Sequence, residues 1–118
     1  MNILGYRSGK AKLLSMTFFT VGCIVDHVTT LYGLSLPNVM ETNPVVILLI
    51  GSGIWNLIDF IFVAAVNGSG LVIFGSKSKI LIAFSITILL MSGIIRLCAG
   101  VNNMMVIFNT LHMLARNL

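Results

Sequence analysis

Long, almost uninterrupted runs of apolar residues constrain the fold of this chain more than any other feature. Of its 118 residues, 58% are hydrophobic and only 8% are charged. A soluble domain covers its apolar core with polar side chains, and seven basic and three acidic residues are too few for that. A membrane core of about 30 Å requires about 20 apolar residues per helix. The sequence therefore predicts an all-α integral membrane bundle of four, or alternatively three, transmembrane helices, forming a single domain over residues 1–118.

The first predicted helix runs from Leu13 to Leu36 and follows three basic residues, Arg7, Lys10 and Lys12. Basic residues beside a crossing favour the cytoplasmic side, so we expect the N-terminus in the cytoplasm. Segment 37–44 contains both prolines of the chain and no basic residue, which is typical of an outer loop. The sequence thus predicts a multi-pass protein of the cell membrane whose chain first crosses from inside to outside.

The next apolar stretch, residues 45–74, is too long for one untilted crossing. A short helix over 44–50 is favoured, with Asn43 as its cap and Pro44 in its first turn. Glycines at 51 and 53 then break the chain before a crossing over 54–74. The rival interpretation is one crossing over 45–66.

The second half of the chain returns through the membrane after Lys77 and Lys79, whose charge places that turn in the cytoplasm. A crossing follows over 80–99, and Gly100 with Asn102 and Asn103 indicates an outer turn. A fourth crossing over 101–115 would then bring the C-terminus back to the cytoplasm. In the alternative with three crossings, the third helix simply extends along the outer face.

Charged residues within the apolar segments are the most informative candidates for a site. All three carboxylates of the chain fall in or near the membrane on the side away from the lysines, and Arg96 reaches a similar depth. An isolated ionised group there costs several kcal/mol. We therefore expect Arg96 to pair with a carboxylate, with a proton or ion path and a metal site as alternatives. The predicted polar cluster comprises Asp26, His27, Thr30, Glu41, Asp59 and Arg96.

A metal site would use His27 beside Asp26, with Glu41, Asp59 and His112 as further ligands. Adjacent residues on a helix point about 100° apart, so Asp26 and His27 are poorly placed to share one ion. No metal or other cofactor is therefore expected. Catalytic motifs with a nucleophile, a base and an orienting group are also missing, so we do not expect an enzyme.

Small and hydroxyl residues form a stripe along the first helix. Gly22, Thr29 and Gly33 share one face with Asp26 and Thr30, at a spacing that allows helices to approach closely. Lipid gives no hydrophobic drive for helix association, so such a stripe is useful only where another helix lies against it. We expect this stripe to serve helix packing, in part against another protein chain.

The run from Asp26 to Thr30, followed by Glu41-Thr42-Asn43-Pro44, resembles a family of small prokaryotic polytopic membrane proteins of unknown function. The pattern of that family is D-x-x-x-T, then E-x-N-P, then a terminal helix bearing an Asn, for which Asn109 is the candidate here. A Lys is common in the family's second crossing, where this chain has Asp59. The chain is also similar in size and hydropathy to the small extra subunit of an archaeal ammonia monooxygenase.

These observations predict a non-catalytic accessory subunit of a larger integral-membrane complex, possible partners being other membrane subunits and lipid. The alternative is a small oligomeric ion or proton transporter or channel that uses the intramembrane carboxylates. Although the net charge is +4, nucleic-acid binding is not indicated, because the basic residues are not interleaved with aromatic ones. No soluble small-molecule substrate is inferred.

Overall fold

The computed structural model describes the chain from residue 3 to residue 116 and its side chains from residue 9, so the side chain of Arg7 lies outside the described residues. This range forms four helices and no strand: α1 (Ile3–Leu34), α2 (Pro44–Gly51), α3 (Trp55–Phe74) and α4 (Lys79–Arg116). Three helical segments are long and apolar enough to cross a membrane, namely Gly9–Leu34 within α1, all of α3 and all of α4. The predicted all-α membrane class is confirmed.

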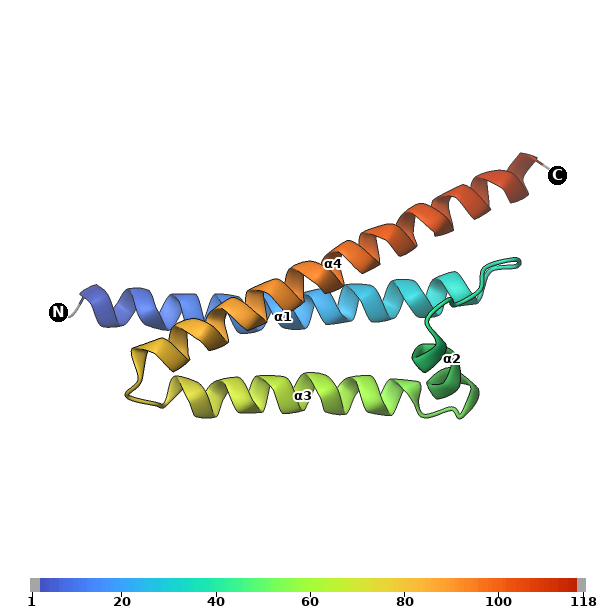
Figure 1. Cartoon of the computed structure of the whole chain (residues 1–118). Helices are drawn as coiled ribbons and strands as arrows, with labels where there is room; N and C mark the ends of the chain where they lie inside the picture. The colour runs from blue at the N-terminus through green and yellow to red at the C-terminus, as the bar shows by residue number, and fades with distance from the viewer. Residues whose placement is uncertain (1–2, 117–118) are drawn as a thin grey trace.

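The three long helices form a narrow bundle that measures 64 × 30 × 17 Å (Figure 1). Helices α1 and α3 run in opposite directions, and α4 lies across α1 and diverges from it towards the C-terminus (Figure 1). The short α2 lies at the end of the bundle where α1 finishes and α3 begins. The chain therefore passes along the bundle three times, and α1 with α4 supplies most of its packing.

The loop between α1 and α3 confirms the predicted short helix and break. Asn43 caps α2, because its Oδ1 accepts a hydrogen bond of 3.0 Å from the N–H of Val45, and Pro44 occupies the first turn. Gly53 has a φ of 73°, a backbone conformation that glycine adopts without steric cost. Since α2 ends at Gly51 and α3 begins at Trp55, the rival crossing over 45–66 is wrong.

Basic residues gather at the opposite end of the bundle, where α3 turns into α4. Lys12 on α1 donates a hydrogen bond of 2.8 Å to the carbonyl of Phe74, and its ammonium lies 5.6 Å from the centre of the Phe74 ring. A cation at this position satisfies a terminal carbonyl of α3 and the negative end of the helix dipole. Lys77 and Lys79 follow in the next turn. Lys12 therefore fixes the end of α3 against α1.

Helix α4 differs from the sequence-based prediction. The turn expected at Gly100, Asn102 and Asn103 is wrong, because α4 continues without interruption through 38 residues, and no separate helix over 101–115 exists. Gly100 serves packing instead, since a Cβ there would lie 2.7 Å from Cγ1 of Val25. Asn103 is held by hydrogen bonds to α1. Tertiary contacts of α4 therefore override residues that would otherwise favour a turn.

A small apolar core lies on the side of Asp26 and Arg96 that is nearer the lysines. Phe19, Cys23 and Leu89 are almost fully buried there, and Phe19 packs edge-on against the ring of Phe62 at 6.2 Å. Most other apolar side chains are exposed on the bundle surface, as expected where lipid is the solvent. The polar cluster therefore lies between this core and the end of the bundle that carries α2.

Candidate functional site

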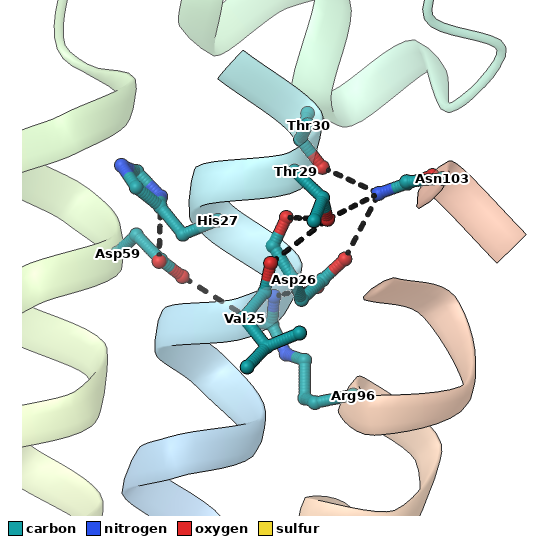
Figure 2. Close-up of polar contacts among 8 residues, drawn as sticks. All are labelled: Val25, Asp26, His27, Thr29, Thr30, Asp59, Arg96 and Asn103. Atoms are coloured by element: carbon teal, nitrogen blue, oxygen red, sulfur yellow. Dashed lines mark hydrogen bonds and ion pairs between the residues drawn. The ribbon is translucent and has the colours of Figure 1, made fainter. Parts of the chain in front are cut away.

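Arg96 of α4 joins carboxylates from both other long helices (Figure 2). Its Nη1 lies 2.7 Å from Oδ2 of Asp26 on α1, and its Nη2 lies 3.4 Å from Oδ1 of Asp59 on α3. The predicted pairing is confirmed, and it involves both carboxylates at once. Asp59 is 7% exposed, so its charge lies in a medium of low dielectric. The guanidinium therefore links all three membrane-crossing helices at one depth.

His27 extends this chain of charges on the α3 side. Its Nδ1 lies 2.8 Å from Oδ2 of Asp59, although the ring nitrogen has no hydrogen bond of acceptable geometry. The imidazole stacks on Trp55, with ring centres 5.8 Å apart and planes 14° from parallel. The contact is thus a close electrostatic one, and Trp55 fixes the ring in place. The sequence gives no direct signal for this pairing of His27 with Asp59.

Adjacent residues on α1 serve different neighbours, as their angular separation requires. Asp26 points to α4 and His27 to α3 (Figure 2). Among the described residues, no group of three or more His, Cys, Asp or Glu side chains is placed to hold a metal ion. The cluster of Asp26, Asp59, His27 and Arg96 can hold charged groups within the membrane, and these side chains can form hydrogen bonds with a bound molecule.

Asn103 completes the polar centre from α4. Its Nδ2 donates to Oγ1 of Thr30 at 2.9 Å and makes longer contacts of 3.4 Å with Oδ1 of Asp26 and Oγ1 of Thr29. Thr29 and Thr30 therefore present oxygen atoms to α4 beside the ion pair (Figure 2). Sequence reasoning assigned Asn103 to a turn and missed this role, although an amide at the depth of buried carboxylates could have indicated it.

We predict that Asn103→Ala destabilises the bundle by about 0.6 to 1.7 kcal/mol, the range measured for side-chain hydrogen bonds between membrane helices. Asn102→Ala is the matched control, since Asn102 is exposed and makes no side-chain hydrogen bond within residues 9–116. Thermal unfolding in detergent, followed by helical circular dichroism, measures both. Equal losses in the two variants would contradict the assigned role of Asn103.

A polar cavity of about 400 Å³ opens beside the ion pair, at the end of the bundle that carries α2. Asp26, Thr30, Glu41, Asn43, Arg96 and Asn103 contribute to its lining. Glu41 is held by the backbone of its own loop, since its Oε1 accepts hydrogen bonds from the N–H groups of Thr42 and Asn43. Glu41 is therefore brought near the cluster without an ion pair to Arg96. Asn109 is exposed and does not line this cavity.

No protein-family model, no curated protein and no solved structure matches this chain.

The predicted stripe on α1 packs against α4 of the same chain. A Cβ on Gly22 would lie 2.6 Å from the carbonyl oxygen of Gly93, and Gly33 faces Ile107. Thr29 is 8% exposed, and its hydroxyl donates a hydrogen bond to the carbonyl of Val25 in the preceding turn. The packing role of Gly22 and Gly33 within the chain is confirmed, whereas the expectation that a partner chain also meets α1 through this stripe stays a prediction. The long α4 supplies the surface that the stripe requires.

Proposed function

We propose that this protein is a non-catalytic accessory subunit of a larger integral-membrane complex, and that it joins its partner through the C-terminal part of α4. The supporting observation is the length of α4. Its 38 residues extend about 57 Å, whereas the hydrocarbon core of a bilayer is about 30 Å thick. The 20 residues of α3 match that thickness without tilt. Even at a tilt of about 40°, α4 would span about 44 Å.

Apolar side chains continue along the part of α4 that extends past the bilayer core. About 20 residues from Lys79, as far as about Cys98, cross the core in an untilted helix, so the segment after residue 103 lies beyond it. Large apolar residues exposed on that segment are Met104, Met105, Val106, Phe108, Leu111, Met113 and Leu114. Large apolar side chains exposed to water at this density mark an interaction site. A protein partner that covers this segment would remove these apolar side chains from water.

Photo-cross-linking from α4 tests this function. A photoreactive amino acid replaces Phe108, which is 71% exposed, and the matched control places it at Phe84, which is 64% exposed on the bilayer-crossing part of the same helix. We expect cross-links from position 108 to one defined protein band in native membranes and from position 84 to lipid. Cross-links to lipid alone at both positions would overturn the proposal.

The complex that this subunit joins is a second part of the proposal. Similarity in size and hydropathy to the small extra subunit of an archaeal ammonia monooxygenase makes a membrane monooxygenase of that kind one candidate. Extraction in mild detergent followed by mass spectrometry of co-purifying proteins identifies the partner. Recovery of the chain alone, as a symmetric oligomer, would contradict both the complex and the accessory role.

We further propose a topology with the N-terminus in the cytoplasm and the C-terminus outside. Lys10, Lys12, Lys77 and Lys79 lie at one end of the bundle and favour the cytoplasm. Three passes then place the end of α4 on the opposite side, which revises the expectation that both termini are cytoplasmic. We predict that a membrane-impermeant maleimide labels Thr42→Cys and His112→Cys from outside, and Ser76→Cys only after permeabilisation. Labelling of positions 42 and 112 from opposite sides would contradict this topology.

A small ion or proton transporter is the second candidate, and the polar cavity favours it. Glu41 and Asp26 both line that cavity, at the end of the bundle that faces outward in the proposed topology. An ion could approach the Asp26–Arg96 pair from there. Proton or cation flux into liposomes that contain the purified chain alone tests this alternative. Flux that disappears in Asp26→Asn would favour the transporter over the accessory subunit.

A further inference from the structure

A second cavity, distinct from the polar one, lies between α1 and α3 and has a volume of about 340 Å³. Ile24 and Val28 of α1 and Phe60 of α3 form part of its wall, and these side chains are 56%, 57% and 72% exposed. All three lie on the bilayer-crossing parts of their helices. The groove is therefore open to the hydrocarbon of the membrane, so a molecule that enters it comes from the bilayer.

Polar side chains in the lining of this groove distinguish it from an ordinary lipid-facing surface. His27 and Asp59 both line it. The Nδ1 atom of His27 is buried and faces Asp59, whereas Nε2 is not among the buried unpaired atoms and has no hydrogen-bond partner within residues 9–116. A ring nitrogen that is accessible from an apolar groove lacks the water that would otherwise satisfy it. A polar group on a bound molecule would satisfy Nε2.

The neighbouring carboxylate defines the chemistry of that group. Because Nδ1 lies 2.8 Å from the Asp59 carboxylate, we infer the tautomer with the proton on Nδ1, which leaves a lone pair on Nε2. A group that bonds to Nε2 must then donate the hydrogen bond. A phosphate or carboxylate is disfavoured, because Asp59 repels it and both terminal nitrogens of Arg96 already contact Asp26 and Asp59.

We propose that the groove between α1 and α3 binds an uncharged, bilayer-soluble amphiphile whose hydroxyl head, of the alcohol, phenol or quinol class, donates a hydrogen bond to Nε2 of His27. The apolar body of the amphiphile packs along Ile24, Val28 and Phe60. Trp55 stacks against the imidazole of His27 and keeps that ring oriented towards the ligand. This site is independent of the proposed partner surface on α4.

The single tryptophan of the chain is a built-in reporter, because Trp55 lies against His27. The probe is a decylphenol with a bromine on its ring, which quenches tryptophan fluorescence at short range, and the full chain is placed in lipid nanodiscs. The matched probe is the methyl ether of the same phenol, which has the same apolar body but cannot donate a hydrogen bond. We expect saturable quenching by the phenol and about tenfold weaker binding of the ether.

Two variants connect the quenching to this groove. In His27→Phe the aromatic ring remains and Nε2 is removed, so phenol and ether are expected to bind equally weakly. Ile24→Phe enlarges a wall residue and is expected to weaken phenol binding at least several-fold. Ile88→Phe, the same change in the apolar groove between α3 and α4, is the control and is expected to leave binding unchanged.

Equal, unsaturable quenching of the native chain by phenol and ether would overturn the site, because it indicates a probe spread through the bilayer. This comparison needs no variant to fold. Preserved discrimination in a folded His27→Phe variant would equally contradict the assignment to Nε2. Decyl phosphate, added as a competitor, is expected not to displace the phenol, and displacement would overturn the assigned head-group class.

Discussion

Arg96→Leu is expected to destabilise the bundle by about 3–5 kcal/mol, the loss found when one partner of a buried ion pair is removed. The change leaves the buried carboxylate of Asp59 and the partly buried carboxylate of Asp26 without their shared cation. Among the described side chains, Asp59 then retains its ion-pair contact with His27 alone. Thermal unfolding in detergent, followed by circular dichroism and by Trp55 fluorescence, measures the loss.

The coupling between Arg96 and Asp26 is expected to be the larger of the two couplings that Arg96 makes. Its contact with Asp26 is 2.7 Å, compared with 3.4 Å for Asp59. A double-mutant cycle with Asp26→Leu therefore gives a non-additive term that exceeds the term from Asp59→Leu. The Asp26→Leu/Arg96→Leu variant is expected to be milder than Arg96→Leu alone, because it removes one of the uncompensated charges. Simple additivity in both cycles would contradict the structural role of the ion pairs.

Gly22→Ala is expected to destabilise the packing of α1 on α4 by about 1–3 kcal/mol, the usual cost of overpacking a close contact. The added methyl group would lie 2.6 Å from the backbone carbonyl oxygen of Gly93 and 3.3 Å from Cβ of Arg96. A backbone carbonyl within a helix cannot rotate away, so the two helices must separate. The separation also lengthens the Arg96–Asp26 contact, which adds to the loss.

Gly68→Ala is the matched control for this substitution. Gly68 lies within α3, and beyond its chain neighbours and the backbone of its own helix a Cβ there would meet nothing within 4 Å. Because alanine is the better helix former by about 1 kcal/mol, Gly68→Ala is expected to be neutral or stabilising. The same unfolding measurement compares the two variants. A stable Gly22→Ala variant would show that α1 and α4 do not approach as closely as their glycines indicate.

Much of the architecture follows from local signals in the sequence. The lengths of apolar runs determine how many residues each crossing requires. Pro44 with Asn43 defines the start of α2, and the glycines at 51 and 53 define the break before Trp55. The position of Arg96 among apolar residues was sufficient to predict that it pairs with a carboxylate, because an isolated charge at that depth is costly.

Other features were decided only by the tertiary structure. Gly100 and Asn103 have a local preference for turns, yet α4 continues through them, since Gly100 allows close approach to Val25 and Asn103 bonds to Thr30. Such local preferences for a turn are overridden when a helix gains packing and hydrogen bonds along its length. The partner of the stripe on α1 was likewise ambiguous in the sequence, because small residues indicate a neighbouring helix without identifying its chain.

The sequence by itself determined that this protein is helical and suited to a membrane, and that charged residues lie within its apolar segments. Each of these properties depends on composition and on spacing along one segment. Only the tertiary structure decided which groups meet. Asp26 and His27 are neighbours in the chain, yet one contacts Arg96 on α4 and the other contacts Asp59 on α3. Helical periodicity separates their directions by about 100°, and the placement of two helices distant in the sequence determines what lies in each direction.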